Sequence, residues 1–462
     1  MSVVDENNYI RQAELILGGG PTITTDDPLT GKPVEFRSRN SYPLGTGLAL
    51  APFVAVGGRD AAPLLALLCV WLGVAATARW LYLAGYSPLW ATLLLVYPAT
   101  VIMGRVAMSE APSLALAAVG AGLYWRGLSG RRAAFVAAGL VAGASLAFRE
   151  ANVLLFAPLF LGSVLRRDTG WPWLVVGGIL GLCLRLVSAA LFFGDPFYTK
   201  PPDPFSLAAI PRNLPLYATS LLLLVPGGLV AAFAYRGPRR PEIIATVVIF
   251  VVFHLTYGYA GEQSGWAKRL VLGPRYFIPL LPILAFTAAE VWPRWGTHLA
   301  ERMSEQRLVA LARAGSVALR GSLGMLAIGL LAAQWLHAGW GADQAAIRDA
   351  IYTKTSAGSV LVSNVRATGK FMDYVGGERR ILDLERLHPS HLERLLESRG
   401  GYFLVLLQRS DSGFRRRQAF ENEMRITRIP HAKDVIVDLQ ATPSDRLRIW
   451  RVGDPTETGQ RE

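Results

Sequence analysis

Residues 172–193, PWLVVGGILGLCLRLVSAALFF, decide the class of this protein. The stretch carries one charged residue, Arg185, and is long enough to cross a bilayer as a helix, which takes about 20 apolar residues. Similar apolar runs recur along most of the 462-residue chain, of which 52% is hydrophobic. We therefore predict a polytopic α-helical membrane protein. The predicted spans lie near 61–84, 88–104, 112–125, 133–148, 151–165, 172–193, 215–235, 242–258, 275–292 and 318–338.

The net charge of +13 has a membrane explanation. Arginine gathers in alternate short loops between the apolar runs, and positively charged loops face the cytoplasm. Nucleic-acid binding is therefore not expected, although this charge would suggest it in a soluble protein. Cys69 and Cys183 lie in apolar runs and are expected to be packing residues, not a disulfide or a zinc site. The arginines assigned to cytoplasmic loops are Arg126, Arg131, Arg132, Arg166, Arg167, Arg236, Arg239, Arg240, Arg294, Arg302, Arg307, Arg313 and Arg320.

The opposite, extracytoplasmic face then carries both ends of the chain. An outward N-terminal segment needs a preceding helix to carry it across the membrane, so we expect a first helix upstream of residue 1. Residues 1–60 are predicted to form the first extracytoplasmic loop, with an amphipathic helix near 8–17 in the membrane interface. The apolar side of that helix would carry Tyr9, Ala13, Ile16 and Leu17. The other segments assigned to this face are the loops near 105–111, 149–150, 194–214 and 259–274 and the tail 340–462.

The tail, residues 340–462, alternates strand and helix patterns. This alternation predicts a small extracytoplasmic α/β domain that follows the transmembrane domain, residues 61–338. No Gly-rich phosphate loop follows any of the predicted strands, so no nucleotide cofactor is expected. The strands are predicted at 359–363, 380–384, 402–407 and 447–452, and the helices near 343–353, 390–398 and 413–424.

Charged residues gather where the spans reach the extracytoplasmic face. Ionisable groups at membrane depth are costly and usually functional. Carboxylates can act as general bases, and guanidinium and ammonium groups can hold a phosphate. The set therefore indicates a site for an anionic lipid headgroup. Its acidic members are Asp5, Glu6 and Glu110, and its basic members are Arg105, Arg149, Lys268, Arg269 and Arg275.

Each member also has a simpler structural interpretation. Asp5 and Glu6, like Glu110, stand where acids favour the start of a helix. Arg149 is followed by Glu150 and could form a local surface pair with it. Lys268 and Arg269 could be ordinary loop charges, and Arg275 could extend its charge from the end of a span to the membrane surface.

Four short motifs on the predicted outer face resemble one known pattern. In chain order they are Asp5-Glu6-Asn7-Asn8-Tyr9, Tyr42-Pro43-Leu44-Gly45, Arg105-Val106-Ala107-Met108-Ser109-Glu110-Ala111-Pro112 and Gly273-Pro274-Arg275-Tyr276-Phe277-Ile278-Pro279-Leu280-Leu281-Pro282. Together they resemble the GT-C glycosyltransferases, which include the protein O-mannosyltransferases and the aminoarabinose transferases of lipid A. The resemblance covers residues 1–340, and the tail resembles the outer soluble domains of many members.

The resemblance implies an enzyme and a role for each matched residue. Asp5 would be the general base, supported by Glu6, and Glu6 and Glu110 would be the candidate ligands of a divalent metal ion. Glu110 would lie at the sugar-phosphate site, and Arg275 would contact the lipid phosphate. The residues that would assist there are Arg105, Arg149, Lys268, Arg269 and Tyr276.

The expected reaction transfers a sugar, with inversion, from a polyprenyl phosphate to a hydroxyl group of a lipid, glycan or protein. It would take place on the outer face of a bacterial inner membrane, where no nucleotide-sugar pool exists. One alternative is a transporter or flippase of lipid-linked sugars, although no internal repeat is found. Another is a non-catalytic subunit of a cell-envelope assembly whose tail binds a partner.

Overall fold

A computed structural model of the protein resolves two compact units. One is Asn40–Gln334, and the other combines Met1–Arg39 with Trp335–Glu462. The residues that the structure describes are 4–18, 22–26, 33–37, 42–198, 205–225, 227–257, 273–302, 331, 342–343, 345–364, 379–384, 387, 389–399, 401–409, 421, 434–441 and 445–453.

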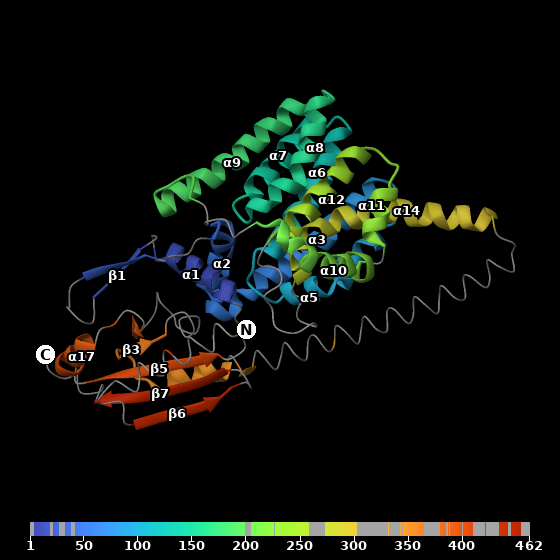
Figure 1. Ribbon diagram of the computed structural model, residues 1–462. Coiled ribbons are helices and arrows are strands. Elements are labelled where there is room, and N and C mark those ends of the chain that lie inside the picture. Colours follow the sequence, from blue (N-terminus) through green and yellow to red (C-terminus); the bar gives the residue numbers. More distant parts are fainter. Residues whose placement is uncertain are drawn as a thin grey trace. The chain divides into compact units, whose positions relative to one another are not determined.

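The first unit is a helical bundle (Figure 1). Its longer helices are α2 (Gly45–Ala61), α3 (Pro63–Leu83), α6 (Glu110–Leu128), α7 (Arg132–Ser145), α8 (Val153–Leu165), α9 (Trp171–Phe193), α10 (Ile210–Thr219), α12 (Arg240–Leu255) and α14 (Leu281–Arg302). Its shorter ones are η1 (Pro88–Thr92), α4 (Leu93–Val96), α5 (Pro98–Met103), η2 (Glu150–Asn152), η3 (Leu207–Ala209), η4 (Ser220–Leu224), α11 (Gly228–Ala234) and η6 (Gly273–Leu280).

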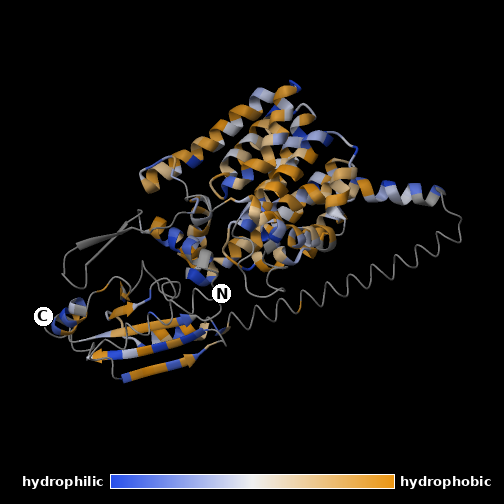
Figure 2. Ribbon diagram, viewed as in Figure 1, coloured by the Kyte–Doolittle hydropathy of each residue, from blue (hydrophilic) through white to orange (hydrophobic). Residues whose placement is uncertain are grey.

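Three helical stretches in the described part of the chain are long and apolar enough to cross a membrane: α3, α9 and Pro274–His298. Large apolar side chains such as Trp71 on α3 and Ile179 on α9 are more than half exposed. Figure 2 shows that α9 is apolar along nearly its whole length. Apolar surface of this extent needs a cover, and lipid supplies it. The chain is therefore a membrane-embedded protein.

Several predicted spans are interrupted. The span predicted at 88–104 consists of η1, α4 and α5, because Pro98 keeps the preceding Tyr97 in an extended conformation. The span predicted at 215–235 includes η4, a π-helical turn, and then Gly227 in the left-handed region. The predicted loop before residue 60 ends in helix α2. The span predicted at 318–338 lies, apart from residue 331, outside the described residues.

Helices α7 and α9 pack closely through glycines spaced four residues apart. A Cβ atom at Gly177 would lie 2.0 Å from the carbonyl oxygen of Val136, and one at Gly139 would lie 2.1 Å from that of Leu174. Both distances are far below van der Waals contact. Small residues at this spacing let two membrane helices approach backbone to backbone. The glycines on the two helices are Gly139, Gly143, Gly177 and Gly181.

The second unit contains a five-stranded sheet in the order β4-β3-β5-β7-β6. Strands β4, β3 and β5 are parallel, whereas β7 is antiparallel to both β5 and β6. The predicted strands and α17 are confirmed, and β6 is an additional strand. The elements are β3 (Val360–Ser363), β4 (Arg380–Asp383), α17 (Pro389–Arg399), β5 (Gly401–Arg409), β6 (Asp434–Gln440) and β7 (Asp445–Gly453), with a further helix at 345–354.

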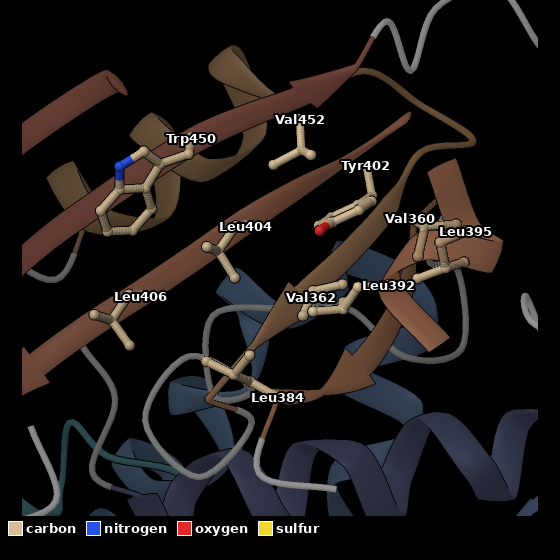
Figure 3. Close-up of a cluster of buried hydrophobic side chains, with 10 residues drawn as sticks. All are labelled: Val360, Val362, Leu384, Leu392, Leu395, Tyr402, Leu404, Leu406, Trp450 and Val452. Atoms are coloured by element: carbon tan, nitrogen blue, oxygen red, sulfur yellow. The ribbon is translucent and has the colours of Figure 1, made fainter. Parts of the chain in front are cut away.

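The central strand β5 is buried on both faces of the sheet. Along β5, Tyr402, Leu404 and Leu406 point to one face, where Leu392 and Leu395 of α17 cover part of the cluster (Figure 3). The alternate residues point to the other face, against Ile347 and Ile351 of the helix at 345–354. This two-residue period is that of a strand buried on both sides. The predicted α/β layer domain is therefore present.

The N-terminal part of this unit holds α1 (Val4–Leu17) and a hairpin of β1 (Thr22–Asp26) and β2 (Pro33–Arg37). The predicted amphipathic helix is present as α1. Its burial does not follow one apolar side, because Gln12 and Glu14 are buried together with Tyr9 whereas Leu17 is half exposed.

Candidate functional site

Glu110 is the first residue of α6, and its side chain is only 3% exposed. The amide groups of a helix N-terminus favour a carboxylate at this position. Two guanidinium groups approach the same carboxylate oxygen: Nε of Arg275 at 3.4 Å and Nη1 of Arg149 at 3.5 Å. The side chains of these arginines are 6% and 16% exposed. Three residues from distant parts of the chain thus form one largely buried charge cluster.

Arg149 is held at the cluster by the junction of α7 and α8. The amide nitrogen of Asn152 donates to Oγ of Ser113 at 3.0 Å and to the carbonyl oxygen of Ser145 at 3.1 Å. Ser113 lies one turn after Glu110 on α6, so these bonds hold the junction against the helix that carries the carboxylate.

The backbone N–H of Gly45 donates to the carbonyl oxygen of Ala147 at 2.6 Å, and a Cβ at Gly45 would lie 2.7 Å from that oxygen. The glycine of the second motif therefore brings the start of α2 to this junction.

Arg275 and Tyr276 lie on η6, near its start. The hydroxyl group of Tyr97, just before α5, donates to the carbonyl oxygen of Pro274 at 2.8 Å. This bond joins two segments that are 177 residues apart in the chain. Nη2 of Arg275 lies 3.4 Å from the hydroxyl oxygen of Tyr276.

The ring of Tyr276 forms a platform for both guanidinium groups. Their central carbons lie 4.9 Å (Arg149) and 5.2 Å (Arg275) from the ring centroid, within cation–π range. The imidazole of His254, from α12, stacks on the same ring with a centroid separation of 5.5 Å. Its Nδ1 is hydrogen-bonded to the carbonyl oxygen of Phe250 at 2.8 Å. The arginines are thus positioned by an aromatic group as well as by their counter-ion.

Among the residues that the structure describes, the cluster carries one positive charge in excess. One carboxylate faces two guanidinium groups, and guanidinium ions bind phosphate oxygens through paired hydrogen bonds. A second, partly buried ionic cluster in the bundle is balanced instead. There Arg239 pairs with both Asp168 and Glu242, and Arg166 pairs with Glu242 at 2.7 Å, so two acids face two bases. The excess at Glu110 therefore marks a place suited to an anion.

The same arrangement does not fit a divalent cation. Glu110 is one of the two candidate metal ligands, and two cations already occupy its surroundings. The described residues contain no group of three or more His, Cys, Asp or Glu side chains that could hold a metal ion.

The remaining predicted site residues have different outcomes. Arg105 is exposed, and within the described part of the chain its side chain makes no hydrogen bond or ion pair. Lys268 and Arg269 lie outside the described residues. Asp5 is in the first turn of α1, but its side chain is not among those described, and the buried side chain of Glu6 belongs to the other unit.

Sequence reasoning missed three residues that shape the site: Tyr97, Asn152 and His254. His254 had a usable signal, because it is an ionisable residue in an apolar span. Tyr97 and Asn152 had none, since each acts through a hydrogen bond to a segment that only the fold brings near.

Comparisons with known proteins agree with this architecture. No protein-family model and no curated protein sequence matches the chain. Among solved structures, it is similar to the crystal structure of ArnT from Cupriavidus metallidurans in the apo state. The two share 15% sequence identity with a TM-score of 0.60, and the match covers 98% of this chain and 94% of the other. ArnT is an aminoarabinose transferase of the GT-C family, so the predicted GT-C-like fold is confirmed.

Proposed function

We propose that this GT-C-like membrane protein transfers a sugar from a polyprenyl phosphate to an acceptor hydroxyl group. The observation that carries the proposal is the excess guanidinium at Glu110, which suits the phosphate of a lipid-linked sugar. The likeness to ArnT supports the same class of reaction. The site would face the outer side of a bacterial inner membrane, as the arginines of the predicted cytoplasmic loops imply.

In the proposed reaction, Arg149 and Arg275 bind the phosphate that links the lipid to the sugar. Asp5 accepts the proton of the acceptor hydroxyl as its oxygen attacks the anomeric carbon from the side opposite the phosphate. The bond between that carbon and the phosphate oxygen breaks, and its electron pair stays on the phosphate. The products are an inverted glycoside and a polyprenyl phosphate. The arginines stabilise the charge that develops on the leaving group, which is the main electrostatic route to catalysis.

A lipid-binding experiment tests the donor site without knowledge of the acceptor. The protein would be purified in mild detergent, and native mass spectrometry would identify the lipids that remain bound. We expect a polyprenyl phosphate, with or without a sugar, on the wild-type protein and its loss in Arg275→Ala. Arg126→Ala is the matched control, because it also removes an arginine, but an exposed one in the last turn of α6, at the end opposite Glu110. Retention of the lipid in Arg275→Ala, or equal loss in both variants, would contradict the assignment.

The general base needs a separate test. Asp5→Asn should abolish sugar transfer while the protein still binds the donor lipid, because the amide cannot accept the proton. Near-normal turnover in this variant would refute the role of Asp5.

A further inference from the structure

A stripe of buried polar residues follows one face of α10 and continues into η4. Asn213, Tyr217 and Ser220 are spaced four and three residues apart, which places them on the same side of a helix. All three side chains are at most 1% exposed. The turn at Ser220 is π-helical, a local form that is frequent at functional sites.

Within the described part of the chain, each member of the stripe has a buried oxygen that makes no hydrogen bond of normal geometry, although Oγ of Ser220 lies close to the hydroxyl group of Tyr97. These atoms are Oδ1 of Asn213, the hydroxyl of Tyr217 and Oγ of Ser220. The amide nitrogen of Asn213 donates to the carbonyl oxygens of Leu255 and Tyr257 at 3.0 and 2.9 Å, so its Oδ1 points away from them. A buried polar group without a partner is costly, and membrane proteins rarely leave one.

Other buried tyrosines of the bundle show what is usual. The hydroxyl of Tyr124 bonds to Ser163 and to the carbonyl oxygen of Leu159 at 2.8 and 3.0 Å. The hydroxyl of Tyr235 donates to the carbonyl oxygen of Pro238 at 3.1 Å. Tyr217 differs from both, because its hydroxyl group has no hydrogen-bond partner among the described residues.

The stripe lies next to the arginine cluster. Helix α10 packs against η6 and α12, and the ring of Tyr217 meets that of Phe277 edge-on at 4.8 Å. Phe277 directly follows Tyr276, the platform of the two arginines. The phenol of Tyr217 is also within electrostatic range of Arg149 and Arg275.

We propose that Asn213, Tyr217 and Ser220 form the subsite for the glycosyl group of the lipid-linked donor. This inference rests on the proposed function and adds the residues that would form hydrogen bonds with the sugar. A sugar presents several hydroxyl groups that both donate and accept, which matches one amide oxygen and two hydroxyls. Its attachment to the phosphate would place it beside the arginines and within reach of the stripe.

The test compares a donor lipid with the same lipid without its sugar. Affinities of the full-length protein would be measured for undecaprenyl phosphate and for its mannosyl and aminoarabinosyl derivatives. Tyr217→Phe and Ser220→Ala should each weaken binding of a glycosylated lipid about five- to tenfold, the equivalent of one hydrogen bond. Binding of bare undecaprenyl phosphate should change less than about twofold, because its phosphate contacts the arginines.

Tyr124→Phe is the matched control, since it removes a buried phenol hydroxyl that is already bonded. It should lower the thermal midpoint and leave the affinities for glycosylated and bare lipid in the same ratio. Tyr217→Phe should not lower the midpoint of the lipid-free protein, because its hydroxyl has no partner to lose.

The outcomes separate the two proposals. If the wild-type protein binds neither kind of lipid, the proposed function fails. If it binds bare lipid but no glycosylated form, or if Tyr217→Phe and Ser220→Ala leave the ratio of affinities unchanged, the subsite is refuted while the phosphate site stands.

Discussion

Replacing Glu110 by glutamine isolates the charge on which the proposed site depends. Glutamine keeps the size of the side chain and removes the only carboxylate that the described structure places between Arg149 and Arg275. The two buried guanidinium groups would then lose the carboxylate that they share, and their mutual repulsion would increase. Removing one partner of a buried ion pair costs about 3–5 kcal/mol. The separations of 3.4 and 3.5 Å exceed those of ideal charged hydrogen bonds, so we expect the lower end, about 3 kcal/mol.

The matched control is Glu150→Gln. Glu150 lies beside Arg149 in the chain, but its side chain is 48% exposed and its partner Arg185 is 3.9 Å away. A pair with a half-exposed carboxylate at this separation contributes less than about 1 kcal/mol. Thermal unfolding in detergent should therefore show a large loss of stability for Glu110→Gln and a small one for Glu150→Gln.

Adding an anionic lipid should restore the thermal stability that Glu110→Gln loses. Undecaprenyl phosphate should raise the thermal midpoint of Glu110→Gln more than that of the wild-type protein, because it supplies the missing counter-ion and no longer meets the carboxylate. Equal melting of the two glutamine variants would refute Glu110 as the buried counter-ion. Equal stabilisation by the lipid in Glu110→Gln and wild type would refute the cluster as its binding site.

Three further predictions test the packing around the site and the C-terminal domain. Gly177→Ala should destabilise the bundle by about 1–3 kcal/mol in thermal unfolding, because its Cβ would overlap backbone, whereas Gly178→Ala, with open space around it, should not. Gly45→Ala should lower transfer activity more than stability, since its Cβ would displace the junction that carries the site, and an unchanged rate would contradict this. In the C-terminal domain, hydrogen bonds from Arg446 lower the pKa of Asp438, so the pair adds stability above the usual carboxyl pKa and loses it as pH falls. Arg446→Gln should return that pKa toward its ordinary value in a carboxyl NMR titration, and an unmoved pKa would exclude the pair as its cause.

The sequence predicted the parts of the fold that depend on local pattern. The helices α3 and α9 follow from uninterrupted apolar length, and β5 from a compact apolar run between polar residues. The charges of the candidate site stood out for the same reason, because Glu110 and Arg275 are rare residue types beside apolar spans.

The rest depends on contacts between distant segments, which a single sequence does not reveal. The close approach of Gly45 to Ala147 depends on the packing of α2 against the α7–α8 junction. The amide of Asn213 and the hydroxyl group of Tyr217 are ordinary in a list of residues, and they become informative only because each has a buried oxygen without a partner among the described residues. Strand β6 was not predicted although Val435, Ile436 and Val437 form a short β-branched run, and as an edge strand it is only partly buried.

The arginine cluster and the polar stripe could bind two parts of the same ligand. Among the described residues, the arginine cluster has one positive charge in excess, and the stripe on α10 and η4 has buried hydroxyl and amide oxygens without hydrogen-bond partners of normal geometry. A sugar joined to a polyprenyl phosphate carries one negative charge on its phosphodiester and a set of hydroxyl groups next to it, so a single ligand meets both needs. When the sugar leaves, the phosphate becomes a monoester with a second ionisation near pH 6 and a charge approaching about −2 at neutral pH. In the proposed reaction the paired arginines would hold that greater charge more tightly than the donor's single charge, so they would stabilise the charge that develops on the phosphate in the transition state and lower the barrier.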